Sequence, residues 1–289
     1  MALDVLAQPD DQRVLFGAGG NIAVSHGPDG TIVIDDQFAP LTPRIMAAIE
    51  ALGAPPARYL INTHWHGDHT GGNENFGRAG AVIMAHDHVR DRMSTRQETR
   101  FGTIEARPAV ALPVITWHDG IQLHMNGGIR TIHMPHAHTD GDSVVWFRAA
   151  NVVHMGDLYF HQVSLPFIDL GSGGNVRGVL AAADRVLAMA DDNTVIIPGH
   201  GPLARKADLQ AYRDMLAEVI GAVERARAEG KTLEQVVAMR PAARWSPPAG
   251  AFISEEAFVT AVWQSLEAPA HHHHGGGHGD SPGEGGHSH

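Results

Sequence analysis

The chain of 289 residues is 43 % hydrophobic and 18 % charged, a globular composition that excludes a disordered or collagen-like protein. Lysine and arginine number 21 against 32 aspartates and glutamates, and the formal charge of −11 opposes binding to a phosphate backbone, so we expect no nucleic-acid partner. The sequence lacks the run of about 20 apolar residues that a membrane span requires, so we expect no membrane partner.

The first part of the chain alternates between short strands and helices. β-Branched or alternating runs separated by Gly-rich turns predict an antiparallel meander, with strands over residues 13–16, 21–26 and 31–35. A helix over residues 42–52 begins with Thr42 and Pro43. The pattern then predicts a strand (58–62), a helix-sized stretch to Phe76, a strand (81–85) and a helix (87–93).

Residues 94–112 follow no regular period and contain Arg96, Arg100 and Arg107. We predict a long surface excursion here, and loops of this length often carry function.

Strands and helices resume after the excursion. Predicted strands span residues 114–117, 121–125, 129–134, 143–147 and 152–155, and a helix (175–190), a strand (194–197) and three helices (207–229, 232–240 and 255–266) follow. Two groups of strands, each followed by helices, favour two sheets packed face to face with helices outside. Periodicity alone leaves an ordinary α+β domain open.

Composition changes sharply at the end of the chain. Residues 269–289 are rich in histidine and glycine and cannot form a hydrophobic core, so we predict a disordered tail. We expect residues 1–12 to form an N-terminal extension and residues 13–268 to form the folded domain. Residues 1–11 contain acids but no base, unlike an intact signal peptide, so we expect a periplasmic or secreted protein if a leader has been removed, and a cytoplasmic one otherwise.

The chain contains 21 histidines and no cysteine. The absence of cysteine excludes disulfides, thiolate ligands and cysteine nucleophiles, so any metal must be bound by nitrogen and oxygen.

The strand over residues 58–62 leads directly into the run THWHGDHTGGN. Residues two apart in an extended segment point the same way, so His64 and His66 can face one ion together. Gly67 permits a sharp turn, which brings Asp68 and His69 back toward the same point. A plain surface turn is the weaker interpretation, because clustered imidazoles and a carboxylate gain nothing without a cation. The run therefore predicts a metal site.

This motif resembles the signature of the metallo-β-lactamase-fold hydrolases. Later residues match that family in the same order: His138 in PHAHTDGD, Asp157 in HMGD and His200 in IPGHG. The resemblance covers residues 13–230 and implies an α/β fold, the four-layer αβ/βα sandwich, with two mixed β-sheets face to face and helices outside.

The resemblance also implies a ligand set. His64, His66 and His138 would hold one metal, Asp68, His69 and His200 a second, and Asp157 would bridge the two. Asp68 is in addition the candidate catalytic carboxylate. Nitrogen and oxygen ligands with two carboxylates suit two Zn²⁺ ions per chain, although iron or manganese could occupy the site. Such a pair would use a bridging hydroxide to hydrolyse a small-molecule substrate.

Other polar residues near these motifs allow more than one interpretation. Asp35 ends a strand where this family often has an acid that orients the site, but a plain strand-end carboxylate is equally consistent, and Asp36 stands beside it. His136 is either close to the site or simply in a loop. His86 and His88 are expected to be structural or on the surface, and no role is assigned to His118, His124 or His133.

Departures from the family pattern bear on the substrate. No cysteine lies near Asp157, which excludes the lactamase subclass with a cysteine ligand, and no lysine follows Asp157 to bind a β-lactam carboxylate. The candidate substrate residues are therefore Arg96, Arg100, Arg107 and His161. We expect a β-lactam or similar cyclic amide as substrate. The alternatives are a lactonase or other ester or thioester hydrolase and, remotely, a metal-buffering protein that uses the histidine-rich tail.

Overall fold

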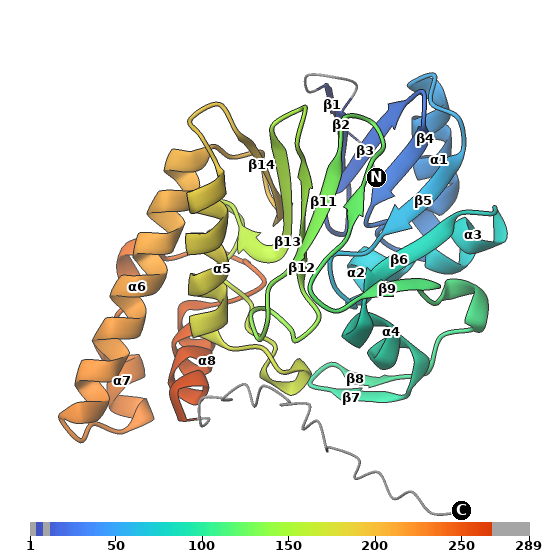
Figure 1. The fold of residues 1–289 in the computed structure, drawn as a ribbon. Helices are drawn as coiled ribbons and strands as arrows, with labels where there is room; N and C mark the ends of the chain where they lie inside the picture. Colours follow the sequence, from blue (N-terminus) through green and yellow to red (C-terminus); the bar gives the residue numbers. More distant parts are fainter. Residues whose placement is uncertain (1–3, 8–11, 268–289) are drawn as a thin grey trace, which may run out of the picture.

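Two β-sheets face one another at the centre of the molecule, and helices cover the outer face of each (Figure 1). The structure is a computed structural model that describes residues 4–7 and 12–267. Its layers follow the order helices, sheet, sheet, helices, which confirms the predicted αβ/βα sandwich. The predicted tail, residues 269–289, lies outside the described residues.

The first sheet has seven strands in the order β1-β2-β3-β4-β5-β6-β9. Their bounds are β1 (Asp4–Ala7), β2 (Gln12–Phe16), β3 (Ile22–Gly27), β4 (Gly30–Ile34), β5 (Ala57–Ile61), β6 (Val82–His86) and β9 (Ile115–Trp117). Strands β1 to β4 pair antiparallel, and β4, β5, β6 and β9 pair parallel. Strand β1 lies inside residues 1–12, so the segment expected to be an extension contributes the edge strand of this sheet.

The second sheet has five strands in the order β10-β11-β12-β13-β14. They are β10 (Gln122–Leu123), β11 (Ile129–His133), β12 (Ser143–Phe147), β13 (Val152–Phe160) and β14 (Val195–His200). Strand β13 continues beyond the predicted end at residue 155, through a register irregularity at Gly156, whose φ is +54°. The sequence does not predict this continuation, because a glycine, which readily adopts the left-handed conformation, is typical of the end of a strand. Asp157 therefore lies within a strand.

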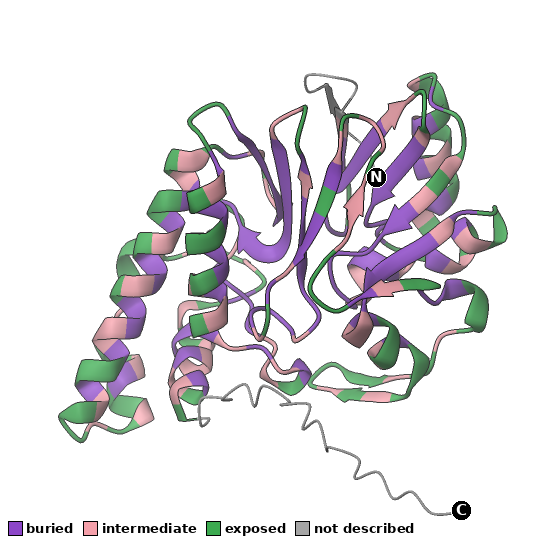
Figure 2. Cartoon of the chain, viewed as in Figure 1, coloured by how far each residue is buried: buried purple, intermediate pink, exposed green. Residues whose placement is uncertain are grey.

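Alternation along the strands explains the layers. Ile32, Ile34 and Ile61 of the first sheet pack against Val145 and Val152 of the second, between the sheets. Their neighbours in sequence face outward: Val33 and Leu60 pack against Ile45 and Ile49 of helix α1, and Val144 and Val153 pack against helices on the other side. Successive strand side chains point to opposite faces, so both sheets are buried on both sides, as Figure 2 shows.

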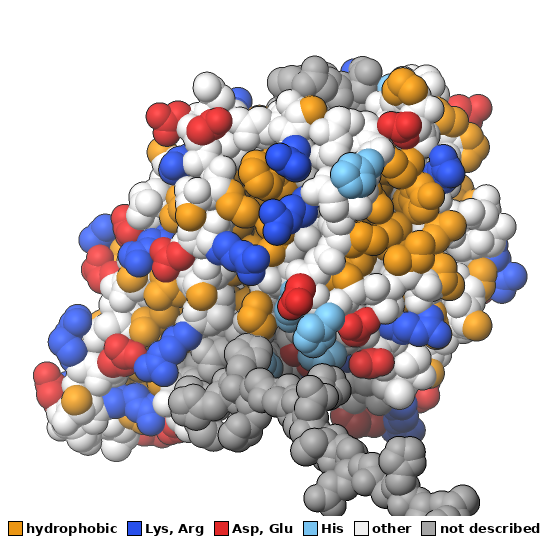
Figure 3. Space-filling model, viewed as in Figure 1, with side chains coloured by type: hydrophobic (Ala, Val, Ile, Leu, Met, Phe, Trp, Pro, Cys, Tyr) orange, Lys and Arg blue, Asp and Glu red, His pale blue; other side chains and the backbone are white. Residues whose placement is uncertain are grey.

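The helices that accompany the first sheet are α1 (Thr42–Ala51), α2 (Gly67–Thr70), α3 (Asn73–Arg78) and α4 (Asp87–Ser94). Those that accompany the second sheet are α5 (Val176–Met189), α6 (Lys206–Ala228), α7 (Leu233–Met239) and α8 (Glu255–Glu267). Short 3-10 helices lie at η1 (Ala39–Leu41), η2 (Ala109–Ala111), η3 (Leu170–Ser172) and η4 (Ala243–Trp245). Charges of both signs mix over the outer helical layer (Figure 3), where Arg213 of α6 pairs with Asp184 of α5. No helix in the described part of the chain is both long and apolar enough to cross a membrane.

The predicted excursion contains more structure than expected. Strands β7 (Gln97–Thr99) and β8 (Gly102–Ile104) form a separate antiparallel hairpin with Arg100 and Phe101 at its turn. None of its strand residues is buried, so the sequence carries no alternation that could reveal it.

Candidate metal centre

Seven side chains converge at one edge of the two sheets. They come from the segment after β5, the loop after β11, strand β13 and the end of β14. The potential ligand atoms form two groups, each with all atoms within 4.8 Å of one another: His64, His66, His138 and Asp157, and Asp68, His69 and His200. These are the seven residues that the sequence motifs predicted as ligands. Six of them divide as the resemblance implies, and Asp157, the expected bridge, falls in the first group.

Asp157 stands between the two groups. Its Oδ2 lies 3.8 Å from His64 Nε2 and 3.7 Å from His138 Nε2. Its Oδ1 lies 3.0 Å from His69 Nε2 and 3.4 Å from His200 Nε2. One carboxylate oxygen therefore faces each group, which is the arrangement that a bridging ligand needs.

Four of the histidines use one ring nitrogen outside the centre. His69 Nδ1 contacts Asp35 Oδ2 (2.7 Å), His66 Nε2 contacts Asp169 Oδ2 (2.9 Å), His138 Nδ1 contacts the Phe167 carbonyl oxygen (2.7 Å), and His64 Nδ1 contacts Thr63 Oγ1 (3.0 Å). In a neutral ring, each of these acceptors favours a proton on the outer nitrogen and leaves the lone pair of the inner nitrogen directed toward the centre. The rings are thus oriented to bind a cation.

Asp35 belongs to the site. Its side chain is fully buried and accepts hydrogen bonds from the backbone N–H of Thr63 (2.8 Å), from Thr63 Oγ1 (2.8 Å) and from His69. The neighbouring Asp36 instead accepts a hydrogen bond from the N–H of Gly72. Of the two open interpretations of Asp35, the structure favours the orienting acid.

Asp169 is a residue that sequence reasoning missed. Its Oδ2 accepts hydrogen bonds from His66 and from Ser172 Oγ (2.6 Å), while its backbone N–H donates to the carbonyl of His138 (3.0 Å). One residue thus fixes the positions of two candidate ligands. The only signal in the sequence is an acid at the start of a Gly-rich segment, which is too common to be diagnostic.

The charges at the centre need cations to balance them. Burial opposes ionisation of Asp157, yet His69 and His200 hold the pKa of its carboxyl well below its usual value. Burial also opposes protonation of His69, but Asp157, Asp68 and Asp35 raise its pKa well above the usual value. In contrast, the buried His64 Nε2 has no hydrogen-bond partner among the residues that the structure describes. Ionised carboxylates beside a free imidazole lone pair fit a bound metal cation.

Two glycines allow the backbone to approach the ligands closely. A Cβ atom at Gly20 would lie 2.1 Å from the His69 ring, and one at Gly199 would lie 2.0 Å from Asp157 Oδ1. Both positions therefore exclude any side chain while the ligands stay in place.

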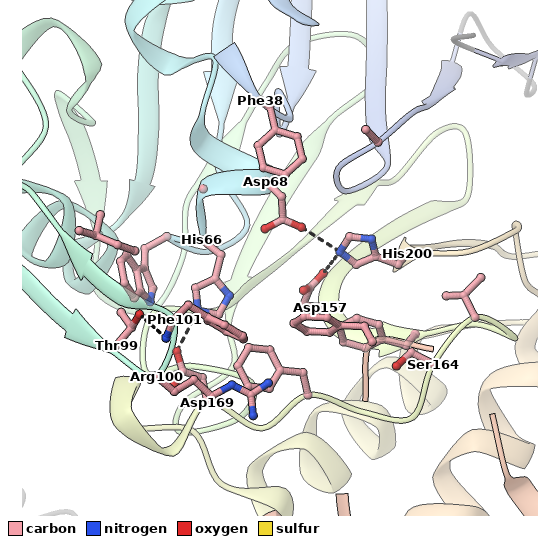
Figure 4. A pocket seen from close by; sticks show the side chains of 18 residues that line it. Phe38, His66, Asp68, Thr99, Arg100, Phe101, Asp157, Ser164, Asp169 and His200 are labelled. Atoms are coloured by element: carbon pink, nitrogen blue, oxygen red, sulfur yellow. Dashed lines mark hydrogen bonds and ion pairs between the residues drawn. The ribbon is translucent and has the colours of Figure 1, made fainter. Parts of the chain in front are cut away.

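A cavity of about 620 Å³ opens over the centre (Figure 4). Its polar lining includes His66, Asp68, Asp157, Asp169 and His200, and six aromatic side chains also line it. Arg100 also lines it. The other candidate substrate residues do not: Arg96 pairs with Glu98 at 2.8 Å, Arg107 lies in a small neighbouring hollow, and His161 lines a separate cavity.

The other histidines lie outside the centre. His86 is fully buried, contacts the carbonyl of His118 through Nε2 and stacks on His133 with ring centres 3.7 Å apart. His88 and His136 contact backbone carbonyls of Asp140 and Gly173. These contacts agree with the structural interpretation of His86 and His88.

The metallo-beta-lactamase superfamily model matches residues 15–200. The chain belongs to the metallo-beta-lactamase superfamily. It is accordingly a metal-dependent hydrolase, which the sequence motifs predicted.

Solved structures show the same fold. A metallo-beta-lactamase from Pontibacter korlensis is 17 % identical, with a TM-score of 0.63 over 75 % of this chain and 99 % of that one. A metallo-beta-lactamase from Hirschia baltica is 18 % identical, with a TM-score of 0.61 over 75 % and 98 %. The sec-alkyl sulfatase PisA1, in a double-mutant form, is 16 % identical, with a TM-score of 0.68 over 91 % of this chain and 50 % of that one.

Binding of a divalent metal, with Zn²⁺ as the probe, should depend on pH through His200. Burial lowers the pKa of the His200 imidazole, but the charge of Asp157 and the hydrogen bonds to Asp157 and Asp68 outweigh burial and raise this pKa to about 9. The metal-free ring therefore holds a proton at neutral pH, which zinc must displace, so zinc affinity should rise with pH up to about 9 and then level off. Calorimetry in buffers of different ionisation enthalpy measures the number of protons released when the metal binds. This proton should be released near neutral pH and should no longer be released above about pH 9. Equal proton release at both pH values contradicts the expectation.

Removal of Asp169 should weaken the group that contains His66 and His138. We expect Asp169→Ala to lower zinc affinity by about 10- to 100-fold, because the His66 ring loses its acceptor and Ser172 loses its side-chain partner, while the backbone hydrogen bond to His138 remains. Asp169→Asn should have a smaller effect, since the amide oxygen can still accept from His66. Competition with a chromophoric chelator measures the affinity, and Asp184→Ala, on the surface of α5, is the control. Wild-type affinity in Asp169→Ala would show that this carboxylate does not support the centre.

Proposed function

We propose that this protein is a dinuclear zinc hydrolase that opens a cyclic amide, with β-lactams as the leading substrate class. The observation that carries the proposal is the position of Asp157, which turns one oxygen toward each of two ligand groups. A single metal would need only one of these groups. Nitrogen and carboxylate ligands without cysteine suit zinc, the metal that this proposal assigns to both.

Two zinc ions would supply a hydroxide at neutral pH and a Lewis acid for the scissile carbonyl. The residues of the chain would then orient the substrate and transfer protons to it. Asp68 lines the cavity, and its Oδ2 lies 3.2 Å from His200 Nε2 (Figure 4). We assign to Asp68 the role of catalytic carboxylate. Although burial raises the pKa of its carboxyl, His69 and His200 lower it to about 2, so the ionised Oδ2 would accept a proton and pass it to the departing nitrogen of an opened amide.

The cavity supports a small-molecule substrate. About 620 Å³ is within the usual range for sites that bind small molecules, and an apolar lining with few polar groups is typical of them. The same machinery opens lactones, other carboxylic esters and thioesters, which form the alternative substrate class. The remote alternative of metal buffering by the tail concerns residues outside those described.

Turnover and metal content together test the function. Zinc-loaded protein should hydrolyse the chromogenic β-lactam nitrocefin, lose this activity after dialysis against a chelator and regain it when zinc is restored. Parallel assays with a γ-lactone and a thioester address the alternative class. Turnover of the lactone or thioester without nitrocefin turnover would replace the leading class by the alternative. No turnover of any of them by protein that holds two zinc ions would contradict the proposal.

Asp157→Asn should loosen one metal more than the other. A neutral amide oxygen cannot offset two cations as a carboxylate does, so we expect one tightly bound zinc to remain and kcat to fall at least about 100-fold. Elemental analysis after gel filtration gives the stoichiometry. His86→Ala, which alters a buried histidine outside the centre, is the control and should retain both metals. Two zinc ions retained at wild-type affinity in Asp157→Asn would show that Asp157 does not bridge.

A further inference from the structure

The mouth of the cavity over the metal centre is lined by exposed apolar side chains. Phe38, Phe101, Val163 and Phe252 come from four separate segments, with exposed fractions of 41 %, 66 %, 39 % and 59 %. They account for much of the large apolar surface that the described chain exposes. Exposed apolar side chains gathered at one site mark a place that an apolar ligand covers.

Arg100 lies among these rings at the turn of the β7–β8 hairpin. Its guanidinium carbon is 4.3 Å from the ring centre of Phe167, 4.5 Å from that of Phe101 and 5.9 Å from that of Phe252. The rings contact one another as well, with Phe167 and Phe252 centres 5.6 Å apart. Such contacts hold a guanidinium in place through attraction between the cation and the aromatic faces.

Within the described part of the chain, the guanidinium of Arg100 makes no hydrogen bond. Within residues 12–267, no carboxylate pairs with Arg100 and no acceptor binds its N–H groups, and it is the one lysine or arginine that lines the cavity. Arg96 of the same hairpin differs, because its guanidinium lies 2.8 Å from Glu98. A guanidinium that aromatic rings hold in place, and that has no acidic partner, can bind a planar carboxylate through two of its own N–H groups.

The positions of the charges define where such a carboxylate can bind. Asp68 and Asp157 lie on one side of the cavity, and Figure 4 shows Arg100 on the side away from Asp68 and His200. A substrate with its scissile carbonyl at the metal centre would extend across the aromatic lining toward Arg100. Its acidic group would then be remote from Asp68 and Asp157. The carboxylate on the Arg100 side of the cavity is Asp169, whose Oδ2 already accepts hydrogen bonds from His66 and Ser172.

We infer that the enzyme selects substrates in which an apolar body carries a carboxylate, with Arg100 as the residue that binds the carboxylate and Phe101, Phe167 and Phe252 as the surface that binds the body. This inference rests on the proposed hydrolase function. It narrows the substrate class to apolar carboxylates and assigns recognition of the carboxylate to the β7–β8 hairpin.

Binding measurements test the inference without turnover. The probes are α,ω-dicarboxylates from succinate to sebacate and the monocarboxylates of equal carbon number, titrated into zinc-loaded protein by calorimetry. At the chain length that spans the centre and Arg100, we expect the dicarboxylate to bind about tenfold more tightly than the monocarboxylate. Arg100→Gln should abolish this preference. Arg96→Gln, on the same hairpin but outside the cavity, should retain it.

A second variant tests the apolar surface. Phe252→Ala removes one ring of the group while Arg100 keeps Phe101 and Phe167. We expect it to weaken the binding of both acids of a matched pair by a similar factor of about three to ten, because the apolar body loses a contact that the carboxylate does not use. Unchanged binding of both acids would remove the apolar body from the inference.

Turnover of a matched ester pair gives an independent readout. Mono-p-nitrophenyl suberate and p-nitrophenyl octanoate differ only in a terminal carboxylate. If the ester class is accepted, Arg100→Gln should raise KM for the suberate ester about tenfold with little change in kcat, and leave the octanoate ester unaffected.

The outcomes separate the two proposals. A dicarboxylate preference that disappears in Arg100→Gln supports the inference even if no β-lactam or ester is hydrolysed, in which case only the proposed function fails. Equal binding of mono- and dicarboxylates at every length, with no effect of Arg100→Gln, overturns the inference even if nitrocefin is hydrolysed.

Discussion

This structure depends on one constraint, which is that carboxylates lie close to imidazoles in a largely buried space. Asp157 and Asp35 are buried, and Asp68 is half-buried beside them. Removing such charges from water is unfavourable unless cations lie within a few ångströms. Protons on His69 and His200 provide partial compensation, and two divalent metals would provide it fully. Much of the surrounding architecture serves to keep these groups together.

The two sheets provide that support. Strands β5, β13 and β14 are buried on both sides near the centre, and each leads to or contains a ligand at its carboxyl end. Loops then add ligands whose outer nitrogens are fixed by Asp35, Asp169 and the Phe167 carbonyl. The hairpin that carries Arg100 lies outside this packed region. The sequence of its exposed strands can therefore change without disturbing the core. The candidate metal ligands and the residue proposed to bind a substrate carboxylate are therefore carried by different parts of the fold.

The parts of the site that were predictable are those encoded locally. His64, His66, Asp68 and His69 fall within one run whose geometry follows from a strand, a turn and a helix start, and strand alternation predicted the layers. Asp169 contacts His66 across 103 positions of sequence, a pairing that no local pattern encodes. Arg100 was one of three equivalent arginines in sequence, and only its aromatic neighbours distinguish it. The continuation of β13 was hidden by Gly156.

Anomalous diffraction at the zinc edge, from crystals of zinc-loaded protein, tests the central claim most directly. The account predicts two peaks on either side of the Asp157 carboxylate, about 3.5 to 4 Å apart. One should lie among His64, His66 and His138, and the other among Asp68, His69 and His200. A single peak at full occupancy, or two peaks that Asp157 does not join, would contradict it.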